Sequence, residues 1–242
     1  MVALRSVLAA AGAAATVILC AAMDLARAGG PSDPAFLIFT GTDLWRYGAF
    51  FYGGTLWTPA GVDAEGFTLK MLLDGGGYTY WAGDVRANVD ATMISASLLP
   101  GWRFKRDHLI LTVFAGPVVQ DYRLTPNDPG SGLHGLYLGA QFSADVWYQP
   151  TAMTMTAVNG TFTTIGLTGS LRVAFGYRLL EPAFIGPEIE EIWTTNFEEL
   201  QFGVHVTGLR TRALEWSASG GWTLTSDQRS GPYLRLGVIT RF

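Results

Sequence analysis

The chain has 242 residues and a formal net charge of −4, with only 15% charged residues against 49% hydrophobic ones. A soluble domain carries about 25% charged residues, so the shortfall indicates that much of the surface does not face water. The slightly acidic balance leaves no basic face, which argues against nucleic acid as a partner.

The first 28 residues have the pattern of a secretory signal peptide. Arg5 supplies a positive start, an apolar run follows over 8–22, and residues 26–28 (Ala-Arg-Ala) fit a small-residue cleavage site. The alternative is an N-terminal membrane anchor, but charges near its end leave the run shorter than the about 20 residues that a span needs. The only cysteine, Cys20, falls in this segment, so we expect an exported protein without disulfides or thiol chemistry.

Beyond residue 35 the recurring unit is a segment of about ten alternating residues followed by a turn, and helical periodicity is scarce. Such alternation predicts strands with one apolar and one polar face. Residues 75–77 are three glycines, which predict strong curvature or a bulge. The predicted strands span 36–45, 48–58, 66–81, 88–104 (broken near Pro100), 109–122, 136–148, 152–159, 164–180, 184–194, 198–209, 214–224 and 233–242.

The turns between these strands alternate between two sides. If the chain starts in the periplasm, the longest turn, 123–135, falls on the outer side together with shorter ones such as 160–163, and outer-membrane barrels carry their longer loops there. A soluble β-sandwich would also alternate, but the polar faces here hold few charges. The sequence therefore predicts an all-β fold: a signal peptide (1–28), a short periplasmic lead (29–35) and a single transmembrane up-and-down antiparallel β-barrel of about twelve strands (36–242).

The last predicted strand places Leu234, Leu236, Val238 and Phe242 in one phase, with Thr240 where another apolar residue is usual. This strand must pair with the first one, because an open edge cannot survive in hydrocarbon. We expect the bacterial outer membrane as the location, its lipid as a partner, and the barrel assembly machinery as a second partner through the strand that ends at Phe242. Five tryptophans near strand ends are expected at the headgroup level: Trp45, Trp57, Trp81, Trp102 and Trp193.

Several segments of the chain point to one known family. They are 206–221 (VTGLRTRALEWSASGG), Ser226-Asp227 and 233–238, and earlier 41–43, 63–70 (DAEGFTLK) and 186–188. Together they resemble the cellulose biosynthesis protein BcsS family. The resemblance implies an outer-membrane protein that accompanies a bacterial cellulose synthase system, with cellulose and cellulose secretion proteins as expected partners. Its motifs are mostly structural glycines, aromatics and turn residues, so it implies no catalytic or ligand site.

Three histidines are the main candidates for chemistry. His108 and His134 fall in predicted turns, where we expect them in solvent. His205 lies on a polar strand face, either as the base of a lipase or deacylase with Ser217 or Ser219, or as an interior residue satisfied by its neighbours. The inward direction favours the second interpretation. No spacing fits a metal site and no glycine loop would cradle phosphate, so we expect no catalytic, cofactor-binding or metal site.

Charged and aromatic side chains on the polar faces are predicted to point into the lumen. Charges of both signs there must pair or be hydrated, so they form either a salt-bridged plug or a polar conduit and glycan-facing surface. Twelve strands enclose less room than the about 16–18 of a general porin, which favours a filled or selective lumen. The candidate lumen and glycan-facing residues are Lys70, Asp74, Tyr78, Tyr137, Asp145, Trp147, Arg172, Arg178, Glu188, Glu215 and Arg235, and Tyr80 and Glu190 share their phase.

These patterns predict a non-enzymatic outer-membrane barrel that is accessory to bacterial cellulose synthesis or secretion and contacts or guides the glucan or the export machinery. One alternative is a small selective channel, which would conduct ions when reconstituted. The other is a barrel enzyme acting on lipid, which would lose lipid turnover in His205→Ala.

Overall fold

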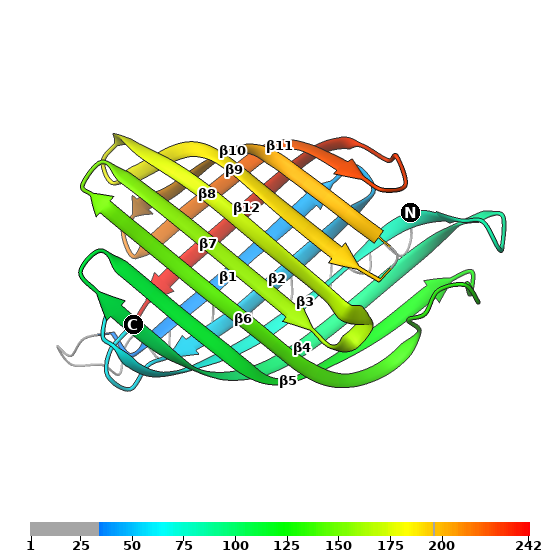
Figure 1. Ribbon diagram of the computed structural model, residues 1–242, viewed down its shortest axis with the longest axis horizontal. Helices are drawn as coiled ribbons and strands as arrows, with labels where there is room; N and C mark the ends of the chain where they lie inside the picture. The colour runs from blue at the N-terminus through cyan, green and yellow to red at the C-terminus, as the bar shows by residue number, and fades with distance from the viewer. Residues whose placement is uncertain (1–33, 196) are drawn as a thin grey trace.

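The computed structural model describes residues 34–195 and 197–242 as one closed barrel of antiparallel strands (Figure 1). Each strand pairs with its neighbours in sequence, and the first pairs with the last. The strands are β1 (Phe36–Trp45), β2 (Gly48–Trp57), β3 (Gly66–Ala82), β4 (Ala87–Arg106), β5 (Leu109–Thr125), β6 (Gly135–Thr151), β7 (Thr154–Thr163), β8 (Thr168–Leu180), β9 (Ala183–Thr194), β10 (Phe197–Thr211), β11 (Leu214–Thr225) and β12 (Gly231–Arg241), with a short 3-10 turn, η1 (Ile165–Leu167). The predicted twelve-stranded up-and-down barrel is confirmed. The predicted signal peptide and residues 29–33 lie outside the described residues.

The outward face of the barrel is apolar. Along β4, Ile94, Leu98 and Trp102 are 61%, 45% and 46% exposed, whereas Ser95 and Leu99 between them are buried. β3, β5, β6 and β8 to β12 also carry exposed leucine, isoleucine, valine, methionine or aromatic side chains on their outer faces. Because a closed sheet with an apolar outside and a polar inside is the arrangement that lipid requires, the wall is that of a membrane-spanning barrel. Among the described residues, none of the helical segments has the length and apolarity of a membrane span.

Tryptophan side chains lie near both ends of this outer face. Trp57, Trp102 and Trp216 lie close to the end where Phe36 pairs with Phe242, and Trp81, Trp193 and Trp222 lie close to the opposite end. Trp45 was predicted in this set, but it is in phase with Asp43 and points inward, where its ring stacks on Phe50 with centroids 5.7 Å apart. The predicted position of Trp45 at a strand end is confirmed, but the predicted outward direction of its side chain is wrong.

We call the end where Phe36 pairs with Phe242 the terminal end, and the opposite end the far end. The backbone of Phe36 exchanges two hydrogen bonds with that of Phe242, so both termini of the barrel lie together. At the far end, the β3–β4 and β5–β6 hairpins extend furthest, in cyan and green at the right of Figure 1. The loop between β5 and β6, residues 126–134, is the longest described there, as the sequence predicts.

Three local predictions are wrong. The turn predicted at 160–163 belongs to β7, which pairs with β6 and β8, and the chain turns instead at η1, where Gly166 and Leu167 have positive φ. Of the two outcomes predicted for the glycines at 75–77, the bulge is wrong, because β3 keeps one register with both neighbours; strong curvature stays a prediction. The break predicted near Pro100 is only a gap in the pairing of β4 with β5, opposite Pro117; the strand itself continues. Neither proline has an N–H to donate to this ladder.

Inward glycines make room for inward aromatic rings. A Cβ atom on Gly41 would lie 2.3 Å from the hydroxyl of Tyr52, and one on Gly54 would lie 2.7 Å from the ring of Phe39. Each ring therefore covers the glycine of a neighbouring strand, which fills the lumen without forcing the strands apart. This packing explains why the chain combines many glycines with many aromatics.

Candidate functional site

The lumen holds a connected group of charged side chains, which we call the ion-pair network: Asp43, Arg172, Glu188, Glu190 and Arg235. Arg235 lies at its centre, with nitrogens 2.5 Å from Asp43, 2.5 Å from Glu190 and 3.7 Å from Glu188. Arg172 forms an ion pair with the other oxygen of Glu188. The network therefore joins β1, β8, β9 and β12 on one wall of the lumen.

Neutral side chains complete this wall. The hydroxyl of Tyr233 donates a hydrogen bond to Glu188 at 2.8 Å, and the side-chain oxygen of Gln201 accepts one from Arg235 at 2.8 Å. Glu188 and Gln201 are almost fully buried. Charges this far from water depend on one another for stabilisation, so this part of the lumen is a filled, salt-bridged wall. The sequence predicted Arg172, Glu188 and Arg235 as candidates, and the structure brings them together.

The opposite wall is more open to water. Lys70 on β3 forms an ion pair with Asp145 on β6 at 2.8 Å, and Asn159 donates a hydrogen bond to the same carboxylate at 3.0 Å. The side chain of Asp145 is 39% exposed, although it points inward. The ammonium of Lys70 also lies 4.0 Å from the centroid of the Phe114 ring, a cation–π contact. This predicted pair is thus placed beside hydrated space, in contrast to the ion-pair network.

Six aromatic side chains line the lumen towards the far end, on β1, β2, β3, β5 and β6. We call this group the aromatic wall: Trp45, Phe50, Tyr78, Tyr80, Tyr122 and Tyr137. The rings form two contact series. The first runs from Trp45 through Phe50 and Tyr78 to Tyr80, with centroid separations of 5.7, 6.4 and 5.9 Å. The second joins Tyr122 to Tyr137 at 6.3 Å. Each ring stays partly accessible.

Asp74 lies next to this aromatic wall. In the sheet it is opposite Tyr52 on β2 and Ser95 on β4, and Tyr122 is opposite Met93, the next inward position on β4. Among the described residues, Asp74 forms no ion pair. The structure therefore places a carboxylate without a cationic partner beside several tyrosines.

The terminal end of the same wall is packed with apolar side chains. Leu56, Leu99 and Phe114 form a buried cluster with Leu37 against it. Leu99 is fully buried, and Leu56 and Phe114 are nearly so. Lys70 pairs in the sheet with both Leu56 and Leu99, so this apolar packing surrounds the base of the Lys70–Asp145 pair and fills part of the lumen at that level.

The remaining predicted candidates lie near the terminal rim. Trp147 packs edge-on against the ring of Phe184. The guanidinium of Arg178 lies 4.6 Å from the centroid of the same ring, and one of its nitrogens lies 3.7 Å from a carboxylate oxygen of Glu181. A pocket of about 360 Å³ opens beside Trp147 and is lined by His108 and Gln149 among others. Glu215 forms ion pairs with Arg210 and Arg241. Trp147 and Arg178 therefore meet at Phe184, and Glu215 belongs to a different set of contacts.

His205 is held by two neighbours. One ring nitrogen lies 3.1 Å from the carbonyl oxygen of Phe175, and the other lies 3.0 Å from the hydroxyl of Thr207. Since a carbonyl only accepts, the first nitrogen carries the proton and the second accepts from Thr207. Ser219 stands opposite His205 in the ladder, but neither ring nitrogen is left to act on it. The interpretation of His205 as a satisfied interior residue is confirmed.

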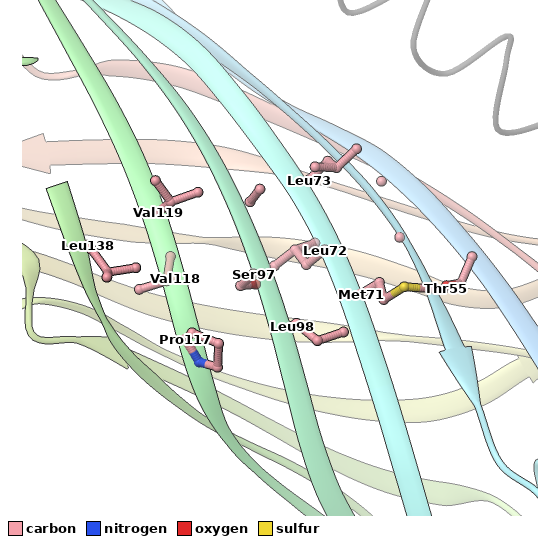
Figure 2. Close-up of a pocket in the computed structure, with 13 residues that line it drawn as sticks. Thr55, Met71, Leu72, Leu73, Ser97, Leu98, Pro117, Val118, Val119 and Leu138 are labelled. Atoms are coloured by element: carbon pink, nitrogen blue, oxygen red, sulfur yellow. The ribbon is translucent and has the colours of Figure 1, made fainter. Parts of the chain in front are cut away.

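A hollow also lies on the outer surface of the barrel. It measures about 540 Å³ and is lined mainly by outward side chains of β2 to β6, including Met71, Leu73, Leu98, Val119 and Leu138 (Figure 2). Small residues such as Gly53 and Ala96 form its base. Because its walls are apolar and belong to the lipid-facing side, this groove lies apart from the lumen.

Sequence reasoning missed several residues of the lumen. Asp43 and Tyr233 share an inward phase with Arg235 and Trp45, which a strict count of alternation in the first and last strands could have found. Phe50 and Tyr122 were missed because the predictions for their strands, 48–58 and 109–122, named no inward-facing residues. Within residues 34–195 and 197–242, no group of three or more histidine, cysteine, aspartate or glutamate side chains is arranged to hold a metal ion.

Comparisons with known proteins agree with this architecture. A family model described as "Cellulose biosynthesis protein BcsS" matches residues 37–242. A comparison with curated protein sequences finds no match. The β domain of the Bordetella autotransporter BrkA is similar in structure, with 14% identity, a TM-score of 0.51, and coverage of 87% of this chain and 100% of that one.

Two further solved structures are similar at lower scores. A KdgM porin has 13% identity and a TM-score of 0.48, over 85% of this chain and 99% of that one. The translocator domain of the autotransporter NalP from Neisseria meningitidis has 15% identity and a TM-score of 0.46, over 97% of each chain. At such identities, the BrkA likeness supports the barrel fold and nothing finer.

Proposed function

Because this chain belongs to the cellulose biosynthesis protein BcsS family, we propose that it is a non-enzymatic barrel of the bacterial outer membrane that assists cellulose secretion. The terminal end faces the periplasm, and the far end, with its longer hairpins, faces outward. In this proposal the lumen side chains contact the glucan chain or the export machinery, and the apolar outer face contacts membrane lipid. Folding into the membrane proceeds through the barrel assembly machinery, which binds the strand ending at Phe242.

The proposal depends mainly on one observation: the barrel wall of this member of the BcsS family has two chemically different faces. The outer face is apolar, whereas the inner face presents charges and aromatic rings. Two features weigh against the alternatives. The buried cluster around Leu99 and the ion-pair network narrow the lumen, which disfavours a wide channel. Both ring nitrogens of His205 are engaged, which disfavours a lipid-cleaving centre on that residue.

Deletion of the gene tests the proposal. We expect the deletion strain to secrete less cellulose, or cellulose of altered fibre form, and expect the wild-type gene and His205→Ala to restore it equally. Heat-dependent migration on gels, which distinguishes folded from unfolded barrels, verifies that the complemented strains contain equal amounts of folded protein. Unchanged cellulose amount and fibre form in the deletion strain would contradict the proposal. Loss of lipid turnover in His205→Ala would support an enzyme instead, and steady single-channel conductance of the reconstituted barrel with normal cellulose would support a channel.

A further inference from the structure

We propose that the aromatic wall, with Asp74 beside it, is a binding site for an uncharged glucan chain at the outward mouth of the lumen. This inference rests on the proposed function and names the ligand class and the residues that hold it. Its basis is the combination of accessible rings, a carboxylate without an ion-pair partner among the described residues, and neighbouring cations that are already engaged.

The rings are fixed in place before any ligand binds. The hydroxyl of Tyr80 donates to Asp128 at 2.8 Å, and that of Tyr122 donates to Gln120 at 3.0 Å. The hydroxyl of Tyr137 accepts from the backbone N–H of His134 at 3.2 Å. Two of these bonds reach the loop 126–134, so the longest outer loop anchors the rings. Side chains that are already ordered lose little conformational entropy on binding, which favours affinity.

A sugar chain matches this surface chemically. A pyranose ring has faces of C–H groups and a rim of hydroxyls, so its faces can pack on aromatic rings while its hydroxyls donate hydrogen bonds. The first ring series, from Trp45 to Tyr80, follows neighbouring strands, and its successive centroids are about 6 Å apart. Asp74 supplies a strong acceptor for hydroxyl donors next to Tyr122. A surface of flat rings with a nearby carboxylate therefore fits a linear glycan.

The charges around the aromatic wall select against acidic glycans. The cations nearest to this surface in the described structure already have partners. Lys70 pairs with Asp145, and Arg229 lies 3.6 Å from Asp227 and donates a hydrogen bond to the backbone carbonyl of Thr79. Arg46, next to Trp45, lies over the ring of Tyr47. Carboxylates belong to the same surface: Asp128 accepts a hydrogen bond from Tyr80, and Asp74 acts electrostatically on Tyr122. A polyanion would meet these like charges and would have to compete for cations that are already engaged, which costs free energy in a partly desolvated lumen. An uncharged chain meets no such penalty.

The outer groove and the pocket beside Trp147 fit a glucan less well. The groove in Figure 2 is apolar and faces lipid, so it offers few hydrogen-bond partners for hydroxyls. The terminal pocket beside Trp147 offers one large ring, and that ring is packed edge-on against Phe184. The aromatic wall is the surface with several rings in series.

Binding of cellohexaose to the refolded full barrel in detergent tests the site, with isothermal titration calorimetry as the readout. We expect Tyr78→Ala and Tyr122→Ala each to weaken binding about tenfold, which corresponds to about 1.4 kcal/mol. Tyr122→Phe should keep most of the affinity because it keeps the ring. Tyr148→Ala is the matched control, since Tyr148 is an outward tyrosine that is 44% exposed. A hexagalacturonate of equal length should bind at least about tenfold more weakly than cellohexaose.

Three results would overturn the inference: no binding of cellohexaose by the folded wild-type barrel, equal affinities of the wild type and both tyrosine-to-alanine variants, or tighter binding of the acidic oligosaccharide. Heat-dependent gel migration shows that each variant is folded, so a collapsed barrel is not mistaken for a lost site. The proposed function and the binding site can fail independently of each other. If deletion reduces cellulose but the wild-type barrel does not bind cellohexaose, the role in secretion stands and the binding site does not.

Discussion

Removal of Arg235 is the most informative perturbation of this barrel. Its guanidinium faces three carboxylates, those of Asp43 and Glu190 at 2.5 Å and that of Glu188 at 3.7 Å, and its side chain is only 12% exposed. Arg235→Ala would leave these carboxylates with Arg172 as the remaining cation of the network. Breaking a buried ion pair by removing one partner typically costs about 3–5 kcal/mol. We therefore expect the free energy of unfolding to fall by at least about 3 kcal/mol.

The measurement is denaturant unfolding of the refolded barrel in detergent micelles, followed by tryptophan fluorescence. Arg123→Ala is the control, because Arg123 forms a 3.0 Å ion pair with Asp121 but is 78% exposed. Such surface pairs contribute about 0–1 kcal/mol. A triple variant, Arg235→Met with Asp43→Asn and Glu190→Gln, should regain most of the lost stability, because it removes the unpaired charges as well as the cation.

The reasoning depends on the network being poorly hydrated. If Arg235→Ala loses no more stability than Arg123→Ala, water reaches these carboxylates and the wall is not a salt-bridged plug. If the triple variant is as unstable as Arg235→Ala, the loss comes from packing of the arginine stem and not from unpaired charge.

Three other predictions follow from the wall itself. Gly76→Ala should destabilise the barrel by about 1–3 kcal/mol, because its Cβ would lie 2.2 Å from the carbonyl oxygen of Ala49, whereas Gly83→Ala, with open space around it, should be nearly neutral in the same unfolding assay. Val204→Arg should cost about 2–4 kcal/mol in lipid vesicles, since Val204 lies on the outer face between the two tryptophan levels, and an effect equal to that of Val204→Leu would argue against a lipid-facing wall. Quenchers at headgroup depth should reduce tryptophan emission more than quenchers at the bilayer centre, because most tryptophans lie near strand ends on the outer face; the opposite order would contradict the belts formed by Trp57, Trp81, Trp102, Trp193, Trp216 and Trp222.

Local rules of turn chemistry predicted most strand boundaries to within a few residues. They failed where hydrogen bonding to the neighbouring strands keeps turn-like residues within a strand. Asn159-Gly160 has the composition of a turn, yet both residues are paired in β7 between β6 and β8. The three glycines at 75–77 suggested a bulge for a similar reason. Gly76 instead accommodates the close approach of Ala49 and Phe50 on the neighbouring strand, and these residues lie outside any sequence window around it.

The sequence by itself determined which side chains face lipid and which face the lumen, because alternation is a local property of an extended chain and needs only the neighbouring residues. The inward direction of Lys70, Asp145 and Arg172 follows from it directly. Trp45 shows the limit of this reasoning. Its position at a strand end suggested a place at the membrane surface, although its phase in the strand directs the side chain into the lumen.

Only the closed barrel decided which inward side chains meet. Arg235 and Asp43 are 192 residues apart and become partners because β12 pairs with β1. Tyr122 and Asp74 come near each other across β4, where Asp74 is opposite Ser95 and Tyr122 is opposite Met93, the next inward position. These contacts depend on the register of every strand around the ring, and closure is a property of the whole sheet that no single strand encodes.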